Sequence, residues 1–453
     1  MKQPNQILTR RRFLAGTSTA GAVAYLAANA RGADSTPPST RSPRSATPPG
    51  STRSSQIPSW PIHDEADASA AADVVRSGKW GRLAGRKTLE FEESLRVKAG
   101  AGYCLATSTG TTALLTSLGV LGVGPGDEVI LPTYTWVACF NVITVNYALP
   151  VFVEPDIETF QIDATKIDSA ITAATKVILP VHLGGSPADI DAVMAISRRR
   201  GIPVLEDACQ SPLAEWKGRV VGNFGIAGCI SFQASKNLTA GEGGAIITND
   251  EEFYIKCFNY HNQGNVRAGA RQVAPLGRGA NFRMTELQAG LLLSQLRRFE
   301  EQQAARGQNA AYLSSLLSQI PGIAPARIRK ECTRHAWHLY MFHYDQSQFA
   351  GLTRAKFMRA LSADGVDAGP GYAQLNKTPH VRAIASNPHY LRIYGKSGMA
   401  AWEERNQTPI TDRLCSEGVW LGQRTLLGGR SEMERIAEAI RKIRSRASEI
   451  AKV

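Results

Sequence analysis

The chain has 453 residues, of which 43% are hydrophobic and 20% are charged. These proportions exclude a disordered chain, a collagen-like fibre and a polytopic membrane protein, and the length is typical of two domains. Lys and Arg number 52 against 39 Asp and Glu, but four of the cations lie in residues 1–30, which contain no acidic residue. The other cations are spread along the chain, so we expect no nucleic-acid partner.

Residues 1–30 predict a twin-arginine export signal. The basic segment Thr9–Leu14 has the sequence TRRRFL, a weakly apolar stretch continues to Ala28, and Ala28-Asn29-Ala30 is typical of a cleavage site. The stretch is too short and too rich in Gly and Thr for a stable membrane span. We therefore expect a periplasmic or otherwise extracytoplasmic protein, with a basic disordered arm as the alternative.

Residues 31–59 are expected to form a disordered linker. They contain 8 Ser, 4 Thr and 6 Pro among 29 residues, and too little apolar surface to offset the entropy of folding. The folded part is therefore expected to begin near Trp60. Seven widely spaced cysteines, mostly inside apolar runs, are interpreted as small buried hydrophobic residues rather than as a disulfide framework.

From residue 105 onward, short β-rich apolar runs alternate with segments of helical length. This order predicts an α/β fold, with a mostly parallel sheet covered by helices on both faces in a large domain over residues 60–314. Residues 315–453 are expected to form a smaller α+β domain. Functional residues in such sheets follow the carboxyl ends of strands. The predicted strands are Val129–Leu131, Val151–Val153, Val177–Val181, Pro203–Leu205, Cys229–Phe232 and Ala245–Thr248.

Hydroxyl residues and a glycine precede an apolar helical run at Thr107–Leu114. Free backbone N–H groups at a helix start, together with hydroxyl donors, suit a phosphate group. Ordinary helix capping is the alternative.

Asp207 and Lys236 follow two different predicted strands. An acid and a lysine so placed suit pyridoxal phosphate, because the lysine forms the Schiff base and the carboxylate keeps the pyridine nitrogen protonated. Such an imine forms near neutral pH when the pKa of the lysine is lowered. Trp136 would stack on the ring of this cofactor.

In these and further motifs the sequence resembles the DegT/DnrJ/EryC1/StrS aminotransferases, which act on keto-sugars and keto-cyclitols. The resemblance covers about residues 58–440 and is closest to the inosose aminotransferase branch. It rests on Thr109–Leu114, Gly124–Ile130, Pro180–Gly185, Glu206–Gln210, Ser231-Phe232, Lys236–Leu238, Gly241–Ala245 and Asn281–Ala289.

The resemblance implies a fold-type I, pyridoxal-phosphate-dependent aminotransferase that works as a homodimer with active sites at the subunit interface. Lys236 would carry the internal aldimine and move the proton, and an amino acid such as glutamate or glutamine would be the donor. Asp207 would pair with the pyridine nitrogen, and Gln210 would lie on the 3-oxygen side of the ring. The phosphate group would be held by Thr109, Gly110, Thr111 and Ser231, and by Asn281 or Arg283 of the neighbouring subunit.

Three further residues are candidates for contact with substrate. His182 is either a satisfied strand-end residue or part of the pocket floor. Tyr372 lies in a loop where the family commonly places substrate contacts, with an ordinary loop residue as the equal alternative. Cys332, His335 and His338 have metal-like spacing, but in an aromatic strand the two histidines would face opposite sides, so we expect no metal and a substrate-side role for His338. The alternative function is an exported binding or sensor protein that keeps the fold without turnover.

Overall fold

The computed structural model describes residues 57–266, 269 and 271–452. The predicted export signal and nearly all of the predicted linker fall on residues 1–56, which lie outside the described residues. Residues Ser55–Val453 form one compact unit. Within the described part of that unit, no helix is long and apolar enough to cross a membrane.

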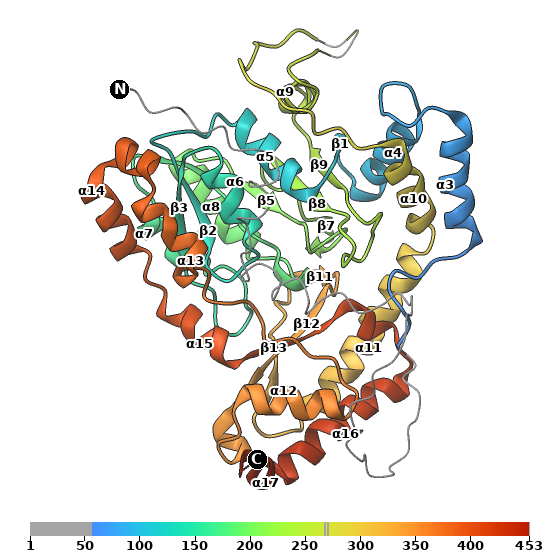
Figure 1. The fold of residues 1–453 in the computed structure, drawn as a ribbon, viewed down its shortest axis with the longest axis vertical. Helices are drawn as coiled ribbons and strands as arrows, with labels where there is room; N and C mark the ends of the chain where they lie inside the picture. Colours follow the sequence, from blue (N-terminus) through green and yellow to red (C-terminus); the bar gives the residue numbers. More distant parts are fainter. Residues whose placement is uncertain (1–56, 267–268, 270, 453) are drawn as a thin grey trace, which may run out of the picture. The chain divides into compact units, whose positions relative to one another are not determined.

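One sheet forms the centre of the N-terminal part of this unit (Figure 1). Its first three strands are parallel and lie in the order β3 (Leu149–Val153), β2 (Glu128–Pro132), β4 (Thr175–Ile178). Parallel bridges from Ile178 to Val204 and from Val181 to Asp207 join β4 to the next four strands. These strands are β5 (Leu205–Asp207), β8 (Ala227–Ser231), β9 (Gly244–Thr248) and β1 (Tyr103–Thr107).

Only β9 runs antiparallel to its two neighbours in this sheet, among the residues that the structure describes. The predicted mostly parallel sheet is thereby confirmed. The carboxyl ends of β2, β4, β5 and β8 consequently share one edge, where Asp207 ends β5 and Ser231 ends β8.

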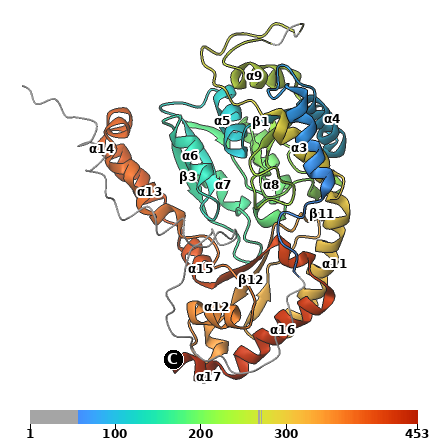
Figure 2. The same ribbon diagram turned by 45° about the vertical axis from the view of Figure 1, so that its right-hand side comes forward.

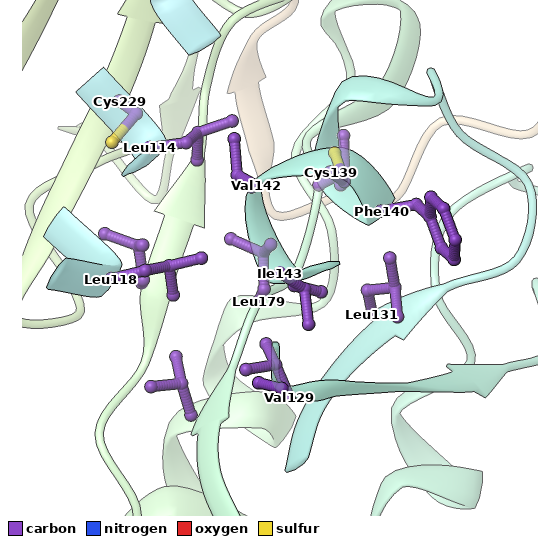
Figure 3. Packing of buried hydrophobic residues seen from close by; sticks show 14 of the residues in the cluster. Leu114, Leu118, Val129, Leu131, Cys139, Phe140, Val142, Ile143, Leu179 and Cys229 are labelled. Atoms are coloured by element: carbon purple, nitrogen blue, oxygen red, sulfur yellow. The ribbon is translucent and has the colours of Figure 1, made fainter. Parts of the chain in front are cut away.

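Helices cover both faces of the sheet, because alternate residues of each strand point to opposite faces. In β1, Leu105 belongs to one apolar cluster, while Cys104 and Ala106 belong to the other. The first cluster includes apolar residues of α5 (Gly110–Val120), α6 (Ala138–Thr144) and α9 (Glu251–His261), part of which Figure 3 shows. The second includes residues of α4 (Lys87–Ala99), α7 (Ile167–Ala170), α8 (Ile190–Arg200) and α10 (Glu286–Leu296). Helix α3 (Glu65–Ser77) packs against α10.

A second, antiparallel sheet lies in the C-terminal part of the chain, where Figure 2 shows helices packed around it. Its strands are β10 (Ile323–Pro325), β12 (Leu339–Tyr344) and β13 (Gly418–Gly422). They share a buried cluster with the helices α11 (Phe299–Leu317), α12 (Arg354–Ala363), α16 (Arg430–Ser445) and α17 (Ala447–Lys452). The predicted domain boundary at residues 314 and 315 falls inside α11.

Part of the predicted small domain packs on the large sheet instead. Helices α13 (Pro379–Arg382), α14 (Pro388–Arg405) and α15 (Pro409–Glu417) cover the edge strand β3. The indole of Trp402 donates to the carbonyl of Pro150 at 2.7 Å, and Glu154 accepts from the N–H groups of Ile410 and Thr411 that begin α15. An edge strand exposes backbone groups that need partners, and these helices supply them.

The remaining elements are short. A small sheet has the order β11 (Cys332–Arg334), β6 (Glu215–Trp216), β7 (Arg219–Val220). The short 3-10 helices are η1 (Ala164–Lys166), η2 (Leu183–Gly185), η3 (Gln346–Phe349), η4 (Leu375–Lys377), η5 (Ala383–Ser386) and η6 (Gln423–Leu427).

Candidate active site

Lys236 lies in the turn that follows β8, where its N–H donates to the carbonyl of Gln233 at 2.8 Å. Burial lowers the pKa of the Lys236 ammonium, because a poorly solvated site disfavours the charged form. The neighbouring groups of Cys209, Asp207 and Cys139 act in the opposite direction without cancelling this effect. A lowered pKa increases the fraction of Lys236 that is uncharged at a given pH, which suits this side chain to act as a nucleophile.

Asp207 ends β5 and is 5% exposed. Its backbone is fixed between strands, since its N–H donates to Pro180 and its carbonyl accepts from His182. Its carboxylate is fixed as well. Oδ1 accepts from the N–H of Cys209 at 2.9 Å, and Oδ2 accepts from the thiol of Cys139 at 3.0 Å. This leaves an oriented negative charge beside Lys236.

The start of α5 forms a narrow seat next to Ser231. Thr109 caps the helix by accepting from the N–H of Thr112, and the N–H groups of Gly110 and Thr111 lie in the first turn, where no intrahelical carbonyl can reach them. A Cβ on Gly110 would come within 2.6 Å of the Ser231 Cβ and 3.0 Å of its hydroxyl oxygen. Glycine therefore lets α5 approach β8 closely enough for amides and a hydroxyl to face one anion.

A hydrogen bond joins Gln210, which follows β5, to Tyr372 in the C-terminal part of the chain. The side-chain amide of Gln210 accepts from the N–H of Gly184 at 2.9 Å and donates to the Tyr372 hydroxyl at 2.7 Å. Burial raises the pKa of Tyr372, so the phenol stays protonated. The half-exposed indole of Trp136 lies 6.3 Å from the Tyr372 ring. The structure thus brings together three of the predicted residues.

His182 is fully buried, and both of its ring nitrogens have partners. Its Nδ1 accepts from the N–H of Ala188, so Nε2 carries the proton and donates to Glu206 at 3.0 Å. Glu206 also accepts from the backbone N–H groups of Gly222, Phe224 and Gly225. This geometry favours the satisfied strand-end interpretation of His182 over the pocket floor.

His338 lies next to the lysine segment. Its Nδ1 is 3.2 Å from the side-chain oxygen of Asn237, the residue after Lys236. Because an amide oxygen only accepts, Nδ1 carries the proton. Burial, followed by the charges of Lys236 and Arg306, holds the pKa of His338 well below its usual range. A neutral imidazole is therefore available beside Lys236.

Cys332 and His335, which precede His338 at metal-like spacing, are engaged elsewhere. Cys332 pairs with Trp216 in the small sheet, and His335 accepts from the N–H of Trp337 while stacking on its indole. Within the described residues, no group of three or more His, Cys, Asp and Glu side chains could hold a metal ion.

Asn281 and Arg283 lie on a segment beside the phosphate seat of their own chain. Between them, the carbonyl of Phe282 accepts from the N–H of Ser108 at 2.8 Å. Asn281 is exposed, whereas Arg283 donates to the side chain of Asn262 at 2.9 Å. Which of the two reaches a neighbouring subunit stays a prediction.

Sequence reasoning missed two residues of this site. Cys139 contacts Asp207, and Asn237 orients His338. Asn237 could have been found from its position next to Lys236. Cys139 gave no such signal, since in the sequence it is one of seven widely spaced cysteines that we interpreted as small buried hydrophobic residues.

The residues fit pyridoxal phosphate. The phosphate seat offers amide and hydroxyl donors, and it is so narrow that a Cβ added at Gly110 would lie 2.6 Å from the Cβ of Ser231. Asp207 supplies an oriented carboxylate near a lysine of lowered pKa. These are the groups that a phosphate, a pyridine nitrogen and an aldehyde require.

Comparisons with known proteins agree with this site. The model of the DegT/DnrJ/EryC1/StrS aminotransferase family matches residues 61–441. The chain is 34% identical to the 3-amino-5-hydroxybenzoate synthase of Amycolatopsis mediterranei over 85% of its length and 96% of the relative. It is also 34% identical to the L-glutamine:2-deoxy-scyllo-inosose aminotransferase of Streptoalloteichus tenebrarius, over 85% of this chain and 94% of the relative.

Among solved structures, the crystal structure of 3-amino-5-hydroxybenzoic acid synthase matches with a TM-score of 0.75 and 33% identity, covering 86% of this chain and 99% of the other. The predicted fold class is thereby confirmed. The chain belongs to the DegT/DnrJ/EryC1/StrS aminotransferase family and is a pyridoxal-phosphate-dependent aminotransferase.

Proposed function

We propose that this enzyme transfers an amino group from glutamine, or from a similar amino acid, to a keto-cyclitol or keto-sugar. Two kinds of relative support the acceptor class, because their names specify an inosose and a UDP-linked amino sugar. Glutamine is the donor in the names of the inosose aminotransferases. The observation that carries the proposal is the convergence of Lys236, Asp207 and Gln210 at one edge of the sheet.

When bound, pyridoxal phosphate supplies an electron sink that stabilises negative charge on the carbon bearing the amino group. Asp207 would accept the pyridine N–H through its oriented carboxylate, and the seat at Gly110, Thr111 and Ser231 would hold the phosphate. Lys236, with its lowered pKa, holds a proton weakly and can take one from the donor and return it to the acceptor. Trp136 would cover one face of the ring.

The enzyme acts as a homodimer whose active sites lie at the interface, and Asn281 or Arg283 reaches the phosphate of the neighbouring site. Residues 1–30 direct export by the twin-arginine route, with the cofactor loaded before export. The family resemblance supports the homodimer, and the sequence motif of residues 1–30 supports export.

The test is whether the purified full chain takes up pyridoxal phosphate and is converted by amino acids. We expect a visible absorption band that is absent in Lys236→Ala, and conversion of the band to the pyridoxamine form by glutamine or glutamate. A protein that stays colourless with added cofactor would refute the proposal. Tight cofactor binding without conversion by any amino acid would support the binding or sensor protein instead.

A further inference from the structure

The carboxylate of Asp207 receives a hydrogen bond from a side chain that lies in none of the segments on which the family resemblance rests. This side chain is Cys139, in the first turn of α6, whose Sγ lies 3.0 Å from Asp207 Oδ2. The other oxygen, Oδ1, accepts from the N–H of Cys209 at 2.9 Å. With one donor on each oxygen, the carboxylate is held in a single orientation. Asp207 and Cys139 are 5% and 1% exposed.

The direction of this hydrogen bond follows from burial. Burial raises the pKa of the Cys139 thiol well above its usual value, and the charge of Asp207 and the hydrogen bond act in the same direction. The sulfur therefore keeps its proton and is the donor. The hydroxyl of Thr135 lies 3.8 Å from the same sulfur. Since the S–H proton points to Asp207, Thr135 donates to sulfur, and a chain of donors runs from Thr135 through Cys139 to Asp207.

The surroundings of the thiol are apolar. Cys139 belongs to the buried cluster that contains Leu131, Phe140 and Val142, and Figure 3 shows it on α6 beside these residues. In such surroundings a hydrogen bond to a charged acceptor is stronger than in water. The same segment that leads from β2 into α6 also carries Trp136, so one turn of chain supplies both the indole and the thiol.

We propose that Cys139 is a positioning residue that orients Asp207 and sets how much negative charge this carboxylate presents to the pyridine nitrogen of the cofactor. A thiol is a weak donor, so it fixes the carboxylate while leaving most of the charge on Oδ2. A hydroxyl in its place would withdraw more charge, and a methyl group would withdraw none. The inference rests on the pyridoxal phosphate site proposed above.

Two variants separate this role from simple packing. A change in the negative charge on Oδ2 changes how firmly the ring nitrogen keeps its proton, and with it the pH at which the visible band of the loaded protein titrates. Since alanine removes the donor and serine strengthens it, we expect Cys139→Ala and Cys139→Ser to shift this pH in opposite directions, each by a few tenths of a pH unit or more. Lost packing would disturb both variants in the same direction.

Cys257→Ser is the matched control. Cys257 lies on α9, is fully buried like Cys139, and makes no hydrogen bond to a carboxylate among the described residues. Its band should titrate as in the unchanged enzyme. Shifts of the same sign in the two Cys139 variants, or shifts no larger than that of Cys257→Ser, would overturn the proposal.

A second measurement needs no cofactor. In the apoprotein, the infrared S–H stretching band of Cys139, identified by its loss in Cys139→Ala, should move when Asp207 is replaced by Asn, because the acceptor loses its charge. An unmoved band would refute the contact. If the full chain fails to bind pyridoxal phosphate, the proposed function fails, while the infrared result still decides whether Cys139 donates to Asp207.

Discussion

Gly110→Ala tests the phosphate seat with a single methyl group. The added Cβ would lie 2.6 Å from the Cβ of Ser231 and 3.0 Å from both its hydroxyl oxygen and the sulfur of Cys209. A Cβ is fixed to its backbone, so rotation of the Ser231 side chain cannot relieve the closest contact. Helix α5 and strand β8 must therefore move apart by several tenths of an ångström.

The magnitude follows from two opposing effects on stability and one on binding. Overpacking costs about 1–3 kcal/mol, whereas alanine favours a helix over glycine by about 1 kcal/mol, so we expect a net loss of about 0–2 kcal/mol. Displacing the Ser231 hydroxyl from a charged phosphate loses about 1.5–3 kcal/mol. The affinity for pyridoxal phosphate should then fall about 10–100-fold.

Gly119→Ala is the control, because it makes the same substitution near the other end of α5, away from the phosphate seat. Its Cβ would lie 2.5 Å from the far end of the Tyr260 side chain, which can move aside more easily than the Cβ of Ser231. Unfolding in urea gives the stability of each variant, and titration of the apoprotein with cofactor gives the dissociation constant. Equal loss of affinity in both variants, or unchanged affinity in Gly110→Ala, would refute the assignment of the seat.

Three more predictions concern stability. The Arg82 guanidinium donates to both oxygens of Glu92, at 2.6 and 2.9 Å. Glu92→Gln leaves this buried cation without a counter-charge, so urea unfolding should show that the free energy of unfolding falls by about 3–5 kcal/mol. A fall below about 1 kcal/mol would contradict this. Glu154→Ala removes the acceptor for the first N–H groups of α15, so thermal unfolding should show that the free energy of unfolding falls by about 1–2 kcal/mol. An unchanged unfolding midpoint would show that Glu154 does not stabilise the start of α15. The pKa of Lys236 is lowered in the folded protein, so the folded state pays a penalty for burying the charged ammonium at neutral pH, and this penalty disappears as the pH rises through the unfolded pKa of 10.5. Lys236→Met should therefore stabilise the apoprotein at pH 7 but not above pH 10.5. A difference in the free energy of unfolding that does not depend on pH would exclude charge burial as the cause.

Local pattern sufficed for the central strands. The apolar run Val129–Leu131 lies in β2 because a strand covered by helices on both faces has apolar residues at every position. Asp207 and Lys236 could also be placed near one another from local pattern, because each follows a predicted strand and the carboxyl ends of parallel strands share an edge of the sheet.

The packing of α13, α14 and α15 could not be predicted in this way. These helices lie in a part of the sequence that we assigned to the small domain, and their contacts with β3 join residues about 250 positions apart, such as Trp402 and Pro150. Nothing in the local pattern of either segment specifies the other. Tyr372 and Gln210 likewise meet although 162 positions separate them in the sequence.

By itself, the sequence determined the class of fold and the chemistry of the site, because apolar periodicity and the order of Gly110, Asp207 and Lys236 are local properties of the chain. Only the tertiary structure decided which side chains contact these residues. His182 is engaged by Ala188 and Glu206, and Cys139 donates to Asp207, through contacts that arise when separate strands and helices pack together. A hydrogen bond forms only when the donor–acceptor distance is correct to within a few tenths of an ångström, and this distance is set by packing rather than by spacing along the chain.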